Sequence, residues 1–222
     1  GPNLIDNISQ FFWKKSLRLF RLIIFFGFSF AAIFAETEII ALCLDVNGPV
    51  MRKGSVRSGL IRRGDYIYHG DKIITGQIGS ASFIMIYEDT SIRLYNNSVI
   101  RLVSERYSML NHSELALFLG RVIIHADDNP GYSFVVNTPS TTAKVSGTNF
   151  LAEYQEDLLF KGVDYSIFTV LDGMVELENQ NSNLSMYLSN GETIVSTETG
   201  KFFRLDTFRH PQGIVNSLLE FR

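Results

Sequence analysis

Apolar and polar side chains alternate along most of the chain after residue 39, and this two-residue period constrains the fold more than any other feature of the sequence. Ala81, Phe83 and Met85, for example, alternate with Ser80 and Ser82. The same spacing recurs in residues 92–94, 100–102, 115–119, 122–124, 134–136, 143–145, 150–154, 175–177 and 186–188. Successive side chains of a strand point to opposite faces, so the pattern predicts short β-strands, with glycine- and asparagine-rich turns between them. The sequence therefore predicts an all-β sandwich, barrel or solenoid.

The N-terminal residues follow a different pattern. Four basic side chains, Lys14, Lys15, Arg18 and Arg21, precede an uncharged apolar run at residues 22–35. A run of this length matches the core of a signal peptide and is shorter than the ~20 residues that a membrane-spanning helix needs. Because the cationic side of such a segment stays in the cytoplasm, everything after it is predicted to be exported to the periplasm.

The sequence leaves the fate of this apolar segment open. It is either a cleaved signal peptide or an inner-membrane anchor at residues 19–35, in which Arg21 would extend toward the membrane surface. A buried core helix is the third alternative, which the one-sided basic flank disfavours. After residue 205, apolar side chains at helical spacing predict a short C-terminal helix. The predicted divisions are a basic region at 1–21, a hydrophobic helix at 22–35, a β domain at 36–204 and a tail at 205–222.

Several motifs of the β region resemble a known family. Gly70-Asp71 and Thr75-Gly76 come first, followed by Thr138-Pro139 and then by Gly147-Thr148 with Phe150 two residues later. In this order they resemble the FecR domain, and the resemblance covers about residues 48–200. It implies an extracytoplasmic domain of short strands wound in a solenoid-like manner, without catalysis. Together with the strand pattern, it leads us to expect a β-solenoid or a β-sandwich.

In its best-known members the FecR family relays a signal from an outer-membrane siderophore receptor to a cytoplasmic sigma factor. This sequence departs from the family pattern at Thr90, where a turn glycine is expected, so that turn would be strained or of another type. Fewer than twenty residues precede the apolar run once the first two are set aside, and only a short tail follows Gly200. We therefore expect the family's module without its anti-sigma and receptor-docking parts.

The motif residues themselves have a structural explanation. A glycine such as Gly147 suits a close approach of backbone, Phe150 suits the interior, and Pro139 marks the end or edge of a strand. We expect the motif residues to determine the fold and not to bind a ligand. They are Gly70, Asp71, Gly76, Thr138, Pro139, Gly147, Thr148 and Phe150.

No catalytic or metal-binding constellation can be assembled from the sequence. The four histidines are far apart, and the adjacent Asp127 and Asp128 belong to a turn before Pro130. The single cysteine, Cys43, is expected in the core of a first strand. A net charge of −3 gives no electrostatic basis for nucleic-acid binding. We expect a non-enzymatic protein with no cofactor and no metal.

One segment combines cations with aromatic residues, as protein interfaces do. The candidate interface residues are Arg57, Arg62, Arg63, Tyr66 and Tyr68. Arg52 and Lys53 belong to the same basic cluster, whose alternative interpretation is an ordinary solvated face.

These observations favour a binding or scaffolding module of the bacterial envelope that contacts a protein partner. The first alternative is a membrane-anchored signalling component of the sigma-regulator type. The second is a carbohydrate-active β-solenoid protein, which the missing row of acidic and basic side chains disfavours.

Overall fold

The computed structural model describes residues 38–105, 111–128, 132–160 and 162–205. The chain divides into two units, Gly1–Thr37 and Glu38–Arg222, and the described residues all lie in the second. The predicted N-terminal and C-terminal helices lie outside them. Within them no helix is long and apolar enough to cross a membrane.

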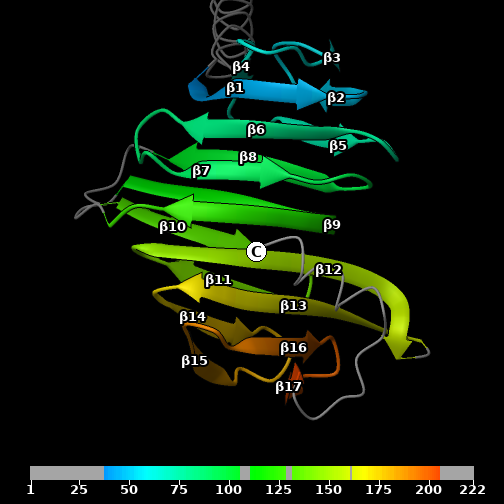
Figure 1. Cartoon of the computed structure of the whole chain (residues 1–222), viewed down its shortest axis with the longest axis vertical. Helices are drawn as coiled ribbons and strands as arrows, with labels where there is room; N and C mark the ends of the chain where they lie inside the picture. The colour runs from blue at the N-terminus through cyan, green and yellow to red at the C-terminus, as the bar shows by residue number, and fades with distance from the viewer. Residues whose placement is uncertain (1–37, 106–110, 129–131, 161, 206–222) are drawn as a thin grey trace, which may run out of the picture. The chain divides into compact units, whose positions relative to one another are not determined.

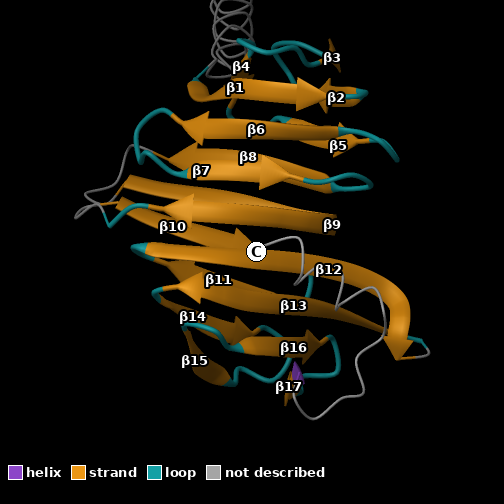
Figure 2. Cartoon of the chain, viewed as in Figure 1, coloured by secondary structure: helices purple, strands orange, loops and turns teal. Residues whose placement is uncertain are grey.

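The regular elements of the described residues are seventeen β-strands (Figure 2). They are β1 (Ile39–Asn47), β2 (Val50–Lys53), β3 (Gly59–Leu60), β4 (Tyr66–Tyr68), β5 (Lys72–Thr75), β6 (Ser80–Met85), β7 (Ser91–Leu94), β8 (Val99–Glu105), β9 (Asn111–Ala126), β10 (Tyr132–Asn137), β11 (Thr141–Val145), β12 (Thr148–Phe160), β13 (Val163–Asp172), β14 (Met174–Asn179), β15 (Ser185–Ser189), β16 (Thr193–Thr197) and β17 (Phe202–Arg204). Within the described residues the prediction of an all-β fold is confirmed, although β9 with 16 residues and β12 with 13 residues are longer than the short strands expected.

The strands pair in two ladders that share β9 (Figure 1). Ladder A runs β4-β1-β6-β7-β9-β12-β13-β16-β17. Ladder B runs β3-β2-β5-β8-β9-β10-β11-β14-β15, with one parallel pair, β9 and β10. The described strands thus form an open sheet with two terminal strands at each end. Whether this arrangement is best classed as a solenoid or a sandwich stays a prediction.

The strand β9 passes from one ladder to the other at Gly120. Its first half pairs with β8 and β10 of ladder B, and its second half pairs with β7 and β12 of ladder A. Gly120 has φ +88°, and a Cβ there would lie 2.6 Å from the Asn97 carbonyl oxygen. Only glycine fits this bend, because both the conformation and the close backbone approach exclude a side chain.

One hydrophobic core joins the two ladders. Phe83 and Phe150 from ladder A and Ile73 and Leu177 from ladder B are fully buried in the same cluster. Each buried side chain of this size stabilises the fold by roughly 1.5–3 kcal/mol. Cys43 in β1 is buried in this core as well, as expected.

The turn that lacks the expected glycine avoids strain by another route. Its positive φ, +52°, falls on Asp89, while Thr90 is buried and has no positive φ. Aspartate tolerates the left-handed region better than a β-branched residue does. The turn has therefore changed type and does not force Thr90 into the strained conformation.

Candidate interaction surface

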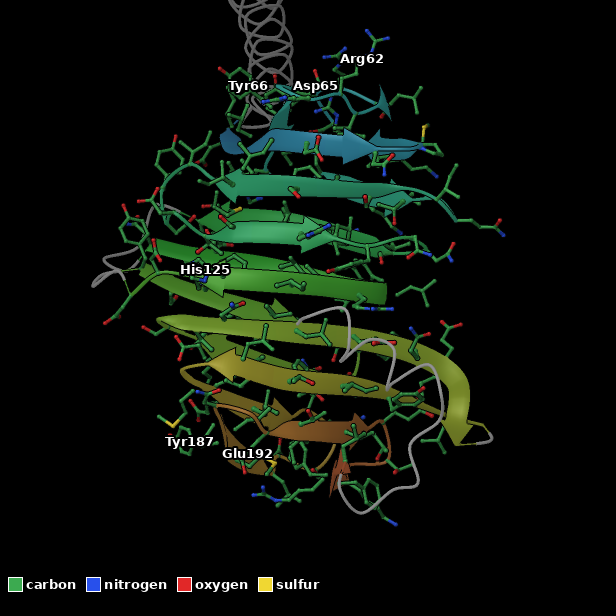
Figure 3. All side chains as sticks on the ribbon, viewed as in Figure 1. Arg62, Asp65, Tyr66, His125, Tyr187 and Glu192 are labelled. Carbon is green, nitrogen blue, oxygen red and sulfur yellow. The ribbon has the colours of Figure 1, made fainter. Side chains whose placement is uncertain are left out.

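The candidate interface residues lie at the end of the sheet formed by the terminal strands β3 and β4. We call Arg57, Arg62, Arg63, Tyr66 and Tyr68 the β3–β4 surface. Arg57, Arg62, Arg63 and Tyr66 are exposed, and Tyr68 is half-buried. Figure 3 shows Arg62, Asp65 and Tyr66 together at this end of the described domain. The structure thus brings together the residues that the sequence predicted, with Tyr68 offering only part of its ring.

The turn that carries Arg62 and Arg63 is fixed to β1. Asp65 accepts a hydrogen bond from the Arg62 backbone N–H at 2.9 Å, and its carboxylate lies 3.6 Å from the Arg57 guanidinium. The Gly64 N–H donates to the Cys43 carbonyl at 2.8 Å, and the Cys43 N–H donates to the Asp65 carbonyl at 2.9 Å. These bonds to a core strand hold the two arginines in a defined position.

A buried ion pair supports the surface from below. Arg52 is 1% exposed, and its Nη1 donates to the Tyr66 carbonyl at 2.5 Å and lies 3.7 Å from Asp71 Oδ2. The same Asp71 oxygen accepts the Tyr68 N–H at 2.9 Å, and the Arg52 guanidinium lies 5.9 Å from the centre of the Tyr68 ring. Burial raises the pKa of Asp71, while the Tyr68 N–H and Arg52 oppose that rise.

The grouping of Arg52 with a solvated basic cluster is therefore wrong. In β2, Val50 and Arg52 are buried whereas Met51 and Lys53 are exposed, so the two-residue period places Arg52 on the core side. A charge in that position requires a buried partner, which Asp71 provides. Gly54 completes the packing, because a Cβ there would lie 1.7 Å from Asp71 Oδ1.

The early motif residues occupy the turns beside this ion pair. Gly70 has φ +81°, and its N–H donates to the Leu102 carbonyl at 2.8 Å. The Gly76 carbonyl accepts the N–H groups of Gly79 and Asn97, both at 3.1 Å. Gly70, Asp71 and Gly76 thus occupy structural positions between strands.

The later motif residues form a second group near the far end of the sheet. Thr138 is buried, its hydroxyl donates to the Thr141 carbonyl at 3.1 Å, and Pro139 is exposed in the same turn. The Thr148 hydroxyl lies 2.8 Å from the Ser146 carbonyl, to which it can donate.

Gly147 and Phe150 complete this group. Gly147 has φ +56°, and a Cβ there would lie 3.1 Å from Asp128 Cβ. Phe150 is fully buried in the shared core. That these residues determine the fold stays a prediction, which substitution of Gly147 tests.

A hollow that the sequence did not predict lies beside Gly147. It has a volume of about 480 Å³ and is lined by Lys144, Ser146, Gly147, Met174, Glu176 and Tyr187, among others. These residues come from β11, β14, β15 and the turn between β11 and β12, and the three strands are neighbours because β14 pairs with both β11 and β15. No single motif in the sequence marks this site, because its lining residues are far apart in the chain: Lys144 and Tyr187 are separated by 43 positions.

The titratable groups of the described residues form no group of three or more that could hold a metal ion. Burial raises the pKa of Glu153, and the Arg121 guanidinium 3.7 Å away opposes this. His125 Nε2 lies 3.5 Å from an Asp127 carboxylate oxygen, with both side chains mostly exposed. An exposed pair of this kind contributes little free energy.

Comparisons with known proteins give one family match and two solved structures of similar fold. A family model described as FecR protein matches residues 71–176. Two solved structures of a protein provisionally described as an anti-sigma factor, from Parabacteroides distasonis, are each 22% identical with a TM-score of 0.50. Each match covers 67% of this chain, and 64% and 63% of the solved chains, so this chain spans less than two thirds of either. At this identity the likeness concerns the fold alone. No curated protein matches the sequence.

Proposed function

Since the chain carries a FecR domain at residues 71–176, we propose that it is an exported, non-enzymatic module that binds a protein partner in the bacterial envelope. The observation that carries this proposal is the β3–β4 surface, which presents three exposed arginines and a half-exposed tyrosine on a support fixed to the core. Interfaces use these residue types because arginine makes planar, multi-donor contacts and tyrosine buries a large area with few rotatable bonds.

The arginines and the apolar residues of this surface would have different roles. Arg62 and Arg63 have no ion-pair partner among the described residues, so their guanidinium groups are available to acidic side chains of a partner. Tyr66 in β4 is 50% exposed and Leu60 in β3 is 58% exposed, which gives this end of the sheet apolar area to bury. The arginines would orient the partner and Tyr66 would supply the burial.

Transmembrane signalling is the second candidate function. The solved structures of similar fold carry the description of an anti-sigma factor, and the family match supports a regulator-type module. Signalling requires that residues 19–35 remain as a membrane anchor, since a cleaved module could not reach a cytoplasmic factor. A reporter for sigma-factor-dependent transcription, measured with and without the chain, distinguishes signalling from scaffolding.

The test of the proposed interface is a charge reversal. Arg62→Glu combined with Arg63→Glu should leave the fold intact, because exposed charges contribute little to stability. It should also remove the partner from a pull-down out of cross-linked cells. Arg93→Glu combined with Lys201→Glu is the matched control, since it changes net charge equally at exposed positions elsewhere. Partner capture by the folded Arg62/Arg63 variant would place the binding surface elsewhere.

Export is tested separately. The basic residues before the apolar run at residues 22–35 predict that a C-terminal alkaline phosphatase fusion is active. A well-expressed but inactive fusion would refute the periplasmic location.

A further inference from the structure

The four terminal strands of the sheet differ in how well they are protected from pairing with another chain. At one end, β3 has two residues and β4 has three. At the other end, β17 has three residues and closes with Arg204, which bonds Glu192. The fourth terminal strand, β15, has five residues, Ser185–Ser189, with neither a charge nor a proline. Short length, charge and proline are the usual protections of an edge, and β15 has none of them.

The hydrogen-bond register shows which groups of β15 point outward. The Asn179 N–H donates to the Leu184 carbonyl at 2.9 Å, and β14 and β15 continue in antiparallel register from this pair. Along an antiparallel strand, the backbone N–H and C=O groups of successive residues point alternately to one neighbour and to the other side. The backbone groups of Met186 and Leu188 therefore point toward β14, whereas those of Ser185, Tyr187 and Ser189 point away from it.

Two of these three residues have outward backbone groups with no hydrogen-bond partner among the described residues. The Ser189 N–H donates to Glu192 Oε2 at 2.8 Å, and its carbonyl accepts the Glu192 N–H at 3.0 Å. Among the described residues, the outward N–H and C=O groups of Ser185 and Tyr187 have no such bond. Two donor–acceptor pairs spaced two residues apart match the backbone of an extended strand.

The side chains beside this edge indicate what the added strand would carry. Tyr187 is 61% exposed and Met174 is 53% exposed, and both line the hollow beside Gly147. Figure 3 shows Tyr187 and Glu192 at this end of the described domain. A residue of the added strand opposite Tyr187 would place its side chain on the same face, against the ring.

The charges on this face favour a cation in the added strand. Lys144 lies 3.5 Å from a Glu176 carboxylate oxygen and 3.7 Å from a Glu178 oxygen, so two carboxylates share one ammonium group. Glu178 pairs in register with Ser185, whose side chain is small. A lysine or arginine opposite Ser185 could therefore reach Glu178.

A second copy of the chain fits this edge poorly. If two β15 strands paired about Tyr187, Ser185 of each would face Ser189 of the other, whose N–H and C=O groups already bond Glu192. Only the Tyr187 pair would form. We infer that β15 is a strand-addition site for an extended segment of a partner protein, with an apolar side chain opposite Tyr187 and a basic one opposite Ser185.

The test uses the full chain in detergent micelles and a blocked synthetic peptide, acetyl-Thr-Leu-Val-Lys-Thr-amide, whose leucine and lysine lie opposite Tyr187 and Ser185 when it pairs antiparallel to β15. Hydrogen–deuterium exchange, resolved to single residues by fragmentation, should slow about tenfold or more at the Ser185 and Tyr187 amides when the peptide is added at about 1 mM. The Met186 and Leu188 amides already face β14 and should change little. Two further peptides carry N-methyl groups on alternate residues. The peptide methylated on the N–H groups that face β15 should not bind, whereas the peptide methylated on the N–H groups that point away should still bind.

A substitution in β15 tests the same hydrogen bonds by changing the protein instead of the peptide. Ser185→Pro removes an outward N–H without removing a bond to β14, so peptide affinity measured by fluorescence anisotropy should fall about tenfold or more. Ser185→Ala keeps the N–H and is the matched control. If Ser185→Pro fails to fold, as judged by circular dichroism, the N-methylated peptides with the wild-type chain decide.

Four results would overturn the inference. The first is a peptide that leaves both amides unprotected, or binds equally with either methylation pattern. The second is folded Ser185→Pro with unchanged affinity. The third is a dimer that dissociates on Ser185→Pro, which would make the occupant a second copy. The fourth is slow exchange at Ser185 and Tyr187 in the free chain that becomes fast when residues 206–222 are deleted, which would make the occupant the chain's own tail.

Discussion

Three glycines with positive φ allow the cost of a side chain to be separated into backbone strain and steric contact. Gly70, Gly147 and Gly173 have φ of +81°, +56° and +89°. A Cβ at Gly70 would meet no atom within 4 Å, and one at Gly147 would lie 3.1 Å from Asp128 Cβ. A Cβ at Gly173 would lie 2.7 Å from the Gly147 carbonyl oxygen and 3.0 Å from Thr148 Oγ1.

Alanine at these positions should destabilise the protein in the order Gly173, Gly147, Gly70. Left-handed backbone costs an L-residue about 1–2 kcal/mol, which is the whole loss expected at Gly70. Gly147→Ala should cost slightly more, and Gly147→Val about 1–3 kcal/mol, because exposed Asp128 can move away. Gly173→Ala should cost about 3 kcal/mol or more, since the atom it meets is backbone that cannot move alone.

Urea unfolding of the purified chain, followed by circular dichroism, measures these losses. The slope of free energy against urea should stay constant, so that shifts of the midpoint report stability. Equal losses at all three glycines would refute the steric part of the reasoning. An unchanged midpoint for Gly147→Val would mean that the motif glycine is not structural.

Two further predictions concern the buried groups beneath the β3–β4 surface. Arg52→Ala should cost about 3–5 kcal/mol of stability at neutral pH, because it leaves the Asp71 carboxylate buried without a cation, whereas Lys53→Ala should cost less than about 0.5 kcal/mol. Burial raises the pKa of Asp71, and protonation of Asp71 removes the buried charge, so the stability loss caused by Arg52→Ala should shrink as the pH falls through that raised pKa. A loss independent of pH would contradict this explanation. Burial raises the pKa of the Cys43 thiol to about 11, so little reactive thiolate is present at pH near 8. A disulfide reagent should therefore label Cys43 only after urea unfolding. Rapid labelling of the native chain would show that Cys43 is accessible.

The strands could be predicted because their pattern is local. Alternation at Ala81, Phe83 and Met85 depends only on which side chains face the core, and these three are buried as the period requires. The same period extended from Val50 to Arg52 would have revealed the buried arginine. The positive charge of Arg52 instead favoured an exposed position, because its buried partner could not be identified from local sequence. That partner, Asp71, lies in a loop nineteen positions later and meets Arg52 only through the pairing of β2 and β5.

Features that depend on strand order could not be predicted from local sequence. The hollow requires β11, β14 and β15 to be neighbours, and the unprotected edge requires β15 to be the last strand of its ladder. Both depend on the chain leaving ladder B after β11, forming β12 and β13 in ladder A, and returning to ladder B at β14, and no local motif marks these changes of ladder. The β3–β4 surface was predictable because its residues are close in the chain.

Site-specific photo-cross-linking in intact cells tests most directly whether the module works by contact through the β3–β4 surface. A photoreactive amino acid would replace Arg62 or Tyr66, and Lys201, exposed at the other end of the sheet, would be the control position. We predict one discrete cross-linked protein from positions 62 and 66 and none from position 201. No cross-link from positions 62 and 66 in a chain that accumulates normally, or the same products from all three positions, would contradict the account.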